Sequence, residues 1–82
     1  MNKNVLFENL DKLHTTPMGI DRIRRNLALG QETDDVVSWC RAQIERPEAE
    51  ITRNGKNWYV SIFGSVLTVN ASSYTIITAH RI

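Results

Sequence analysis

The fold is decided by the stretch Gly55-Lys-Asn-Trp-Tyr-Val-Ser-Ile-Phe-Gly-Ser-Val-Leu-Thr-Val-Asn-Ala-Ser-Ser-Tyr-Thr-Ile-Ile-Thr-Ala-His80. Apolar and polar residues alternate along it, and glycine, asparagine and serine interrupt the alternation at intervals. Alternation is typical of strands with one buried face, and the interruptions are typical of tight turns. The stretch therefore predicts an antiparallel meander.

The first turn is predicted at Asn54-Gly55, because a two-residue turn of this composition is the strongest hairpin signal. The register that follows pairs Ile51 with Trp58, so apolar residues meet on one face. It also pairs Arg53 with Lys56, and like charges placed opposite each other repel. We therefore expect a local anion site at this hairpin tip.

A second turn, predicted at Gly64-Ser65, agrees with the first about which face is buried. It pairs Ile62 with Leu67 and Val60 with Val69 on that face. The other face of the sheet then carries polar side chains from the middle strands: Tyr59, Ser61, Thr68 and Asn70.

The third turn, around residues 71–73, leaves two alternatives open. A two-residue Ser-Ser loop would put every second side chain from Tyr74 to His80 on the buried face, whereas a three-residue loop would put the same side chains on the polar face. Ser-Ser lacks the Gly or Asn that a tight turn prefers, so we favour the longer loop. The side chains concerned are those of Tyr74, Ile76, Thr78 and His80.

Three helices are predicted before the sheet from apolar stripes and end signals. The first has the stripe Leu6, Phe7, Leu10 and Leu13. The second runs from about Pro17 to Leu29, between a Thr16-Pro17 start and a Gly30 stop. The third begins at residues 33–35, with Asp34 and Asp35 complementing the helix dipole, ends before Pro47 and has the stripe Val36, Val37, Cys40 and Ile44.

We therefore expect an α+β fold with three N-terminal helices packed on one face of a four-stranded antiparallel meander, as a single domain over residues 1–82. Ten basic and nine acidic residues give a net charge of +1, so no global field favours nucleic acid or lipid. No apolar run is long enough for a membrane span, and the N-terminus lacks a signal-peptide core. With Cys40 as the single cysteine, the chain predicts a cytoplasmic protein without a metal site or a cofactor.

Candidate functional residues come from the polar face and from local clusters of positive charge. For acid–base chemistry the candidates are His80 and Tyr74. For binding they are Arg22, Arg25, Arg53, Lys56, Tyr59, Asn70, Thr78 and His14. Most have a simpler alternative: His14 as a cation at a helix end, His80 as a solvated or hydrogen-bonded side chain, and Arg25 paired with Asp21. Arg53 and Lys56 can be splayed into water at a flexible hairpin tip, and the tyrosines can be ordinary residues of an exposed sheet face.

Several segments of the chain resemble a small bacterial family known as domain of unknown function 3781. They are Lys12-Leu-His-Thr-Thr16, Gly19-Ile-Asp-Arg-Ile-Arg-Arg-Asn-Leu27, Asp35-Val-Val-Ser-Trp-Cys40, Gly55-Lys-Asn-Trp-Tyr-Val60 and Thr68-Val-Asn-Ala-Ser-Ser-Tyr-Thr-Ile-Ile-Thr-Ala-His80. The resemblance covers nearly the whole chain. It implies a family but no activity, and it carries no functional residues.

The architecture is also similar to the ribonuclease-toxin superfold of barnase, colicin nuclease domains and RelE-like toxins. That similarity implies an active site on the sheet face away from the helices. RNA cleavage needs a base, an acid and cations for the phosphate, for which His80, Tyr74, Lys56 and Arg53 are the candidates.

Two functions therefore follow as expectations. The first is an RNA- or anion-binding module that uses its polar sheet face and is ribonuclease-like at most. The alternative is a protein-interaction or homodimerisation module without chemistry, which an exposed edge strand at residues 49–53 would permit.

Overall fold

The computed structural model describes residues 2–30 and 35–81. Helices precede strands, so the α+β class is confirmed. The elements are α1 (Asn2–Glu8), the short 3-10 helix η1 (Leu10–Lys12), α2 (Pro17–Asn26), α3 (Val36–Ile44), β1 (Glu50–Asn54), β2 (Asn57–Ile62), β3 (Ser65–Asn70) and β4 (Ile76–Arg81). The strands form one antiparallel sheet in the order β1-β2-β3-β4.

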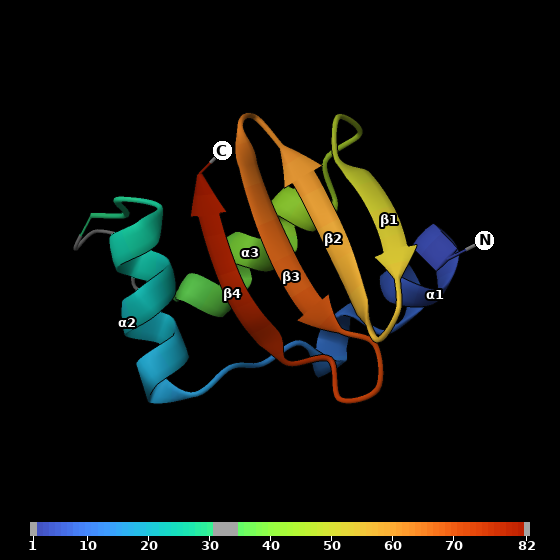
Figure 1. The fold of residues 1–82 in the computed structure, drawn as a ribbon, viewed down its shortest axis with the longest axis horizontal. Coiled ribbons are helices and arrows are strands. Elements are labelled where there is room, and N and C mark those ends of the chain that lie inside the picture. Colours follow the sequence, from blue (N-terminus) through green and yellow to red (C-terminus); the bar gives the residue numbers. More distant parts are fainter. Residues whose placement is uncertain (1, 31–34, 82) are drawn as a thin grey trace.

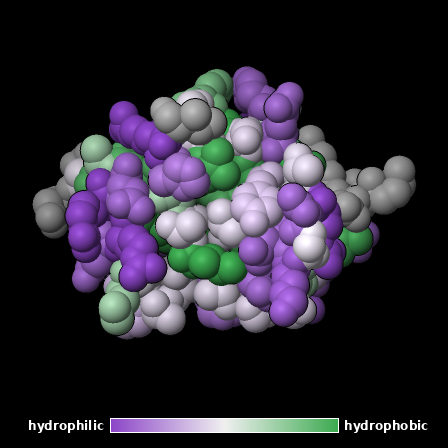
Figure 2. Space-filling view, viewed as in Figure 1, coloured by the Kyte–Doolittle hydropathy of each residue, from purple (hydrophilic) through white to green (hydrophobic). Residues whose placement is uncertain are grey.

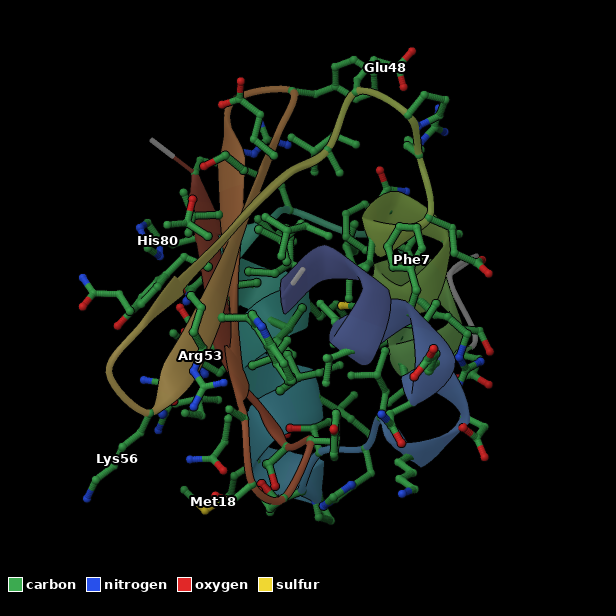
Figure 3. The ribbon with its side chains drawn as sticks, turned by 90° about the vertical axis from the view of Figure 1, so that its right-hand side faces the viewer. Phe7, Met18, Glu48, Arg53, Lys56 and His80 are labelled. Atoms are coloured by element: carbon green, nitrogen blue, oxygen red, sulfur yellow. The ribbon has the colours of Figure 1, made fainter. Side chains whose placement is uncertain are left out.

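The described helices leave one face of the sheet uncovered. In Figure 1, α1 and α3 lie behind the sheet, while α2 stands beside β4 at its edge. The side view in Figure 3 shows α1 and α3 on one side of the strands. The expected layering thus describes α1 and α3, whereas α2 flanks the sheet.

The core lies between the sheet and the helices. Its fully buried side chains include Leu6, Ile23, Cys40 and Ile44 from the helices and Trp58, Val60, Leu67, Val69 and Ile76 from the strands. One member of the predicted first stripe does not belong to it, since Phe7 is 37 % exposed. The helical path changes after α1, where the Asn9 side chain donates to the Val5 carbonyl oxygen and η1 begins.

The predicted start of α2 is confirmed, since the Thr16 hydroxyl accepts a hydrogen bond from the Gly19 amide at 3.0 Å. The helix ends at Asn26, three residues before the predicted Leu29. The cause is Ala28, which has a φ of 54° in the left-handed region. The amides of Ala28 and Leu29 donate to the Arg25 and Arg24 carbonyl oxygens, the pair of bonds of a Schellman motif.

The start of α3 is set by Asp35, whose carboxylate accepts hydrogen bonds from the Ser38 amide at 3.0 Å and the Ser38 hydroxyl at 2.9 Å. The helix therefore begins at Val36. Residues 33 and 34 of the predicted start, including Asp34, lie outside the described residues.

Both predicted hairpin turns are wrong by one residue. The first turn lies at Gly55-Lys56, so Arg53 pairs with Trp58 and not with Lys56. The second lies at Phe63-Gly64. Glycine explains both shifts, because Gly55 and Gly64 have φ values of 63° and 77° and occupy turn positions that require positive φ. Moving a turn by one residue changes each pairing by two positions, so the predicted faces are kept.

The third turn follows neither alternative. Residues 71–74 form the loop, in which the Tyr74 amide donates to the Asn70 carbonyl oxygen and Tyr74 has a φ of 60°. A β-bulge then shifts the register: Thr68 pairs with Thr78, but Val69 pairs with Ile76. The extra residue is Ile77, so the side chains on either side of it point to opposite faces of the sheet.

Candidate functional site

The side of the sheet away from α1 and α3, here called the open face, has no described helix over it (Figure 1, Figure 3). The strand registers place on it Glu50, Thr52, Asn54, Asn57, Tyr59, Ser61, Val66, Thr68, Asn70, Thr78 and His80. At its centre Tyr59 is half-buried and pairs with Thr52 on one side and Thr68 on the other. Thr68 is only 7 % exposed, because side chains of the neighbouring strands shield it.

The open face has an uncharged middle with polar edges. Figure 2 shows pale and green side chains over the middle of the sheet, with purple side chains over α2 on the left and over the β1–β2 hairpin on the right. The middle residues are Tyr59, Ser61, Val66, Thr68 and Thr78. A surface of this kind offers contact area and hydroxyl groups in its centre and charge at its rim.

Two candidate residues from the last strand lie on this face. Thr78 pairs with Thr68, and His80 pairs with Val66. His80 is exposed. Figure 3 shows both the His80 ring and the Lys56 side chain on the side of the sheet away from α1 and α3. The expectation of an outward His80 is confirmed, and the β-bulge at Ile77 produces it.

Tyr74 is on the opposite side, so the expectation that it shares a site with His80 is wrong. Its ring packs against the buried Trp58 ring with centroids 5.5 Å apart, and the Lys12 Nζ atom lies 5.7 Å from its centroid. The bulge is the physical reason, because Tyr74 precedes it and His80 follows it. These two residues therefore do not form an acid–base pair.

Asn70 uses its side-chain oxygen within the third loop. The Oδ1 atom accepts hydrogen bonds from the Ser72 amide, the Ser73 amide and the Ser73 hydroxyl, at 2.9, 2.9 and 3.2 Å. Such side-chain bonds to the following amides stabilise a turn. Asn70 therefore stabilises the third loop, and it also lies at the end of the open face.

His14 joins the segment before α2 to the start of β4. Its Nδ1 atom lies 2.9 Å from the Lys12 carbonyl oxygen, which can only accept, so Nδ1 carries the hydrogen. In the neutral ring Nε2 then accepts from the Thr75 hydroxyl, 3.1 Å away. The His14 backbone also donates to the Tyr74 carbonyl and accepts from the Ile76 amide. Both ring nitrogens are thereby engaged in holding this edge of the sheet.

The candidate cations do not converge on one point. Arg22 and Arg25 are exposed on α2, whereas Lys56 is exposed in the β1–β2 turn. These elements lie at opposite edges of the sheet in Figure 1. The neighbouring Arg24 donates to the Gly30 carbonyl oxygen at 2.8 Å, which places its charge at the C-terminal end of α2.

Arg53 differs from Lys56 in having a packing partner. Its guanidinium lies 5.4 Å from the centroid of the Trp58 ring, and its Nε atom donates to the Gly55 carbonyl oxygen at 3.0 Å. The predicted repulsion between Arg53 and Lys56 therefore does not arise. Of the two, Lys56 is the cation left for an outside anion.

Sequence reasoning missed two apolar residues near the candidate site. Val66 lies on the open face opposite His80, and the alternation within β3 was a sufficient signal for it. Ile77 is 41 % exposed at the bulge. No local pattern marked it, because a bulge depends on the pairing of two strands.

Nucleophilic and metal chemistry gain no support from the described residues. Burial raises the pKa of the Cys40 thiol to about 12, so the reactive thiolate is not formed near neutral pH. Within residues 2–30 and 35–81, no three His, Cys, Asp or Glu side chains are grouped closely enough to hold a metal ion. In the same part of the chain, none of the helices has the length and apolar character needed to cross a membrane.

The fold and the open face define an α+β domain with a bare, largely uncharged sheet surface. Residues 7–80 match the model of the family described as protein of unknown function (DUF3781), so the chain belongs to that family. Comparisons with curated proteins and with solved structures gave no match.

Proposed function

We propose that the chain is a binding protein for single-stranded RNA and that the open face is its binding surface. The observation that carries this proposal is the position of Tyr59, half-buried at the centre of a sheet face without any described helix over it. Proteins that bind single strands stack bases on aromatic side chains of such faces. Each stacked base stabilises the complex by about 1–3 kcal/mol.

The charge distribution within the sheet supports an anionic partner. The open face has one carboxylate, that of Glu50, whereas Lys56 in the β1–β2 turn and His80 on β4 are its exposed basic side chains. Positive charge at the rim attracts phosphate groups, while the uncharged centre is left for bases.

The dimensions of the sheet limit what can bind. Four strands spaced about 4.8 Å apart span roughly 15 Å, and a four-stranded sheet accommodates about two or three bases. A strand of RNA running from α2 to the β1–β2 hairpin would meet Arg22 or Arg25 at one edge and Lys56 at the other. With one central aromatic, we expect modest affinity that decreases strongly with salt.

The proposal is for binding without cleavage. Acid–base cleavage of RNA needs two groups that reach the same scissile phosphate, a base beside the attacking 2′-hydroxyl and an acid beside the leaving oxygen. His80 is on the open face, but Tyr74 packs against Trp58 on the other side. We also place this function in the cytoplasm, where Cys40 would stay reduced.

The direct test is fluorescence polarisation with a labelled single-stranded RNA of mixed sequence at low salt. Tyr59→Ser should weaken binding roughly 5- to 150-fold, the equivalent of one lost stacked base. Tyr59→Phe is the matched control, because it keeps the ring and should retain the affinity. Equal binding by both variants would exclude stacking on Tyr59.

The cations are tested by the salt dependence of the same measurement. Lys56→Gln should reduce the slope of log affinity against log salt by about 0.7, the value for one phosphate contact to a single strand. Arg46 follows α3, and its guanidinium lies 5.5 Å from the centroid of the Phe63 ring in the β2–β3 turn, so Arg46→Gln is the control. A wild-type affinity that is independent of salt would contradict the proposal.

A second candidate function is homodimerisation through β1. Within the described residues β1 is the free edge of the sheet, since β4 is joined to His14 and flanked by α2. In a ladder closed by a two-residue turn, bonded and non-bonded pairs alternate. The amides of Ile51 and Arg53 therefore point outward, where a second β1 could pair with them.

Light scattering over a range of concentrations tests this second function. If β1 pairs with a second copy, the wild type will be dimeric and Arg53→Pro, which removes an outward amide, will be monomeric. Arg53→Gln keeps the amide and should remain dimeric. A monomeric wild type at high concentration would rule out this function and leave the RNA proposal intact.

A further inference from the structure

A second candidate site lies at the end of the sheet that has the β2–β3 turn. A pocket of about 500 Å³ is formed where the C-terminal end of α2, the outer part of α3, the β2–β3 turn and the end of β4 meet. In Figure 1 the β2–β3 turn and the C-terminal end of β4 lie together at the top of the molecule. Pockets that bind small molecules have volumes of about 300–1,000 Å³.

The pocket combines an apolar interior with a few polar groups. Leu27 and Ile62 are buried in its wall, and Trp39 is a half-buried aromatic residue beside them. Phe63, at the rim, is 68 % exposed. Large aromatic and aliphatic surfaces of this kind provide most of the contact area for a small organic ligand.

Among the described lining residues, the charged side chain is that of Arg81. Its guanidinium donates one hydrogen bond to the Leu27 carbonyl oxygen at 2.9 Å. A guanidinium has five N–H donors, so others are available for a ligand. Gln43 and Ser65 add neutral hydrogen-bonding groups, and no carboxylate side chain is among the lining residues that the structure describes.

Backbone strain is concentrated at the same place. Three non-glycine residues of the described chain have positive φ, and two of them, Ala28 at 54° and Phe63 at 49°, line this pocket. The left-handed conformation costs about 1–2 kcal/mol for a residue with a side chain. Ala28 ends α2 and Phe63 forms the β2–β3 turn with Gly64, so both conformations belong to the chain reversals that shape the pocket. Phe63 thus has an aromatic ring at the pocket rim, at a position where glycine would adopt the positive φ without steric cost.

From these observations we infer that the pocket binds a small aromatic acid. The aromatic ring lies against Trp39 and Phe63, and the anionic group, a carboxylate, sulfonate or phosphate, accepts hydrogen bonds from Arg81. This site is independent of the proposed RNA surface.

The experiment compares two probes that differ in charge: naphthalene-1-sulfonate and the neutral 1-naphthol. Titration of the ¹⁵N-labelled protein is expected to shift the Trp39 indole signal and the amides of Gly64 and Ser65, while the signals of Tyr59 and Thr78 stay in place. The sulfonate is expected to bind more tightly than the naphthol.

Arg81→Gln should weaken the sulfonate roughly tenfold or more and leave the naphthol unchanged. Arg25→Gln is the matched control, since Arg25 is on α2 but does not line the pocket. Gln43→Trp, which fills the pocket without touching Arg81's bond to Leu27, should abolish binding of both probes. The Gln43→Trp variant therefore tests the pocket even if the Arg81→Gln variant does not fold.

Shifts confined to residues outside the pocket would overturn the inference, as would equal affinity for the two probes. Full retention of sulfonate binding by Gln43→Trp would do the same. Loss of RNA binding in the Tyr59→Ser variant has no bearing on this site, so the two proposals fail or succeed separately.

Discussion

The Arg53 guanidinium and the Trp58 indole ring face each other across the β1–β2 pair, 5.4 Å apart. The contact belongs to a series, because Trp58 also packs against Tyr74, and Lys12 lies over Tyr74. The indole Nε1 atom of Trp58 is buried and has no hydrogen-bond partner within the described residues. Contacts with the ring faces therefore hold this side chain.

We expect Arg53→Ala to lower the free energy of unfolding by about 1 kcal/mol, since a cation over a tryptophan ring contributes about 0.5–2 kcal/mol. Urea denaturation followed by tryptophan fluorescence measures this change. Lys56→Ala, in the adjacent turn, is the control and should stay within about 0.5 kcal/mol of the wild type. Equal effects of the two substitutions would show that the ring contact contributes nothing.

Ala28→Gly is expected to stabilise the protein by about 0.5–1 kcal/mol. Ala28 has positive φ at the Schellman position that ends α2, where glycine has no steric cost. The reverse is expected for Ala42→Gly in α3, which should destabilise by about 0.5–1 kcal/mol. Thermal denaturation of the two variants compares them directly. Destabilisation by Ala28→Gly would mean that the unfolded chain's entropy outweighs the relieved strain.

Asn70→Ala should destabilise the third loop by about 1–2 kcal/mol, because three hydrogen bonds to Asn70 Oδ1 are lost. Asn70→Asp keeps an acceptor in the same place and should retain most of the stability. Amide exchange at Ser72 and Ser73 is the local readout. Unchanged exchange rates in Asn70→Ala would show that the loop is held by other contacts, such as the Tyr74 amide bond to the Asn70 carbonyl.

Stability should decrease in acid through Asp35. Hydrogen bonds from the Ser38 amide and then the Ser38 hydroxyl lower the pKa of Asp35 below its ordinary value. A carboxyl whose folded-state pKa is lowered adds stability above the unfolded-state pKa and loses it as the pH falls through the folded-state pKa. The window is therefore below about pH 4.

Denaturation measured at intervals from about pH 5 to pH 2 gives the contribution of Asp35. Asp35→Asn keeps a good helix cap but cannot titrate, so its stability should fall less in this window than that of the wild type. Identical pH profiles would assign the acid sensitivity to other carboxyl groups.

The faces of the first two hairpins could be predicted from sequence, although both turns were misplaced. The reason is that Gly55 and Gly64 were assigned to the wrong position within each turn, an error that preserves the face of every side chain. The position of Tyr74 could not be predicted. It follows from the four-residue loop 71–74, in which Tyr74 has positive φ. The outward side of His80 follows from the bulge at Ile77, and such pairing irregularities have no signal in a single strand.

The candidate sites also differ in whether they follow from alternation within a strand or from the packing of distant segments. The open face follows from alternation, so Tyr59 could be identified from sequence. The pocket beside Arg81 could not, since it is built from the ends of α2, α3 and β4 and from the β2–β3 turn. Only the packing of these distant segments brings Trp39, Phe63 and Arg81 together.

The bulge residue Ile77 separates an inward-facing part of the last strand from an outward-facing part. Before it, Ile76 is an interior residue, and changes there are constrained by the volume of the core. After it, Thr78 and His80 face outward and can vary in chemistry without disturbing that volume. Without Ile77 the alternation would run uninterrupted through the strand, so either Ile76 would face solvent or His80 would face the core. The length of the strand is thus more tightly constrained than the identity of its outward residues.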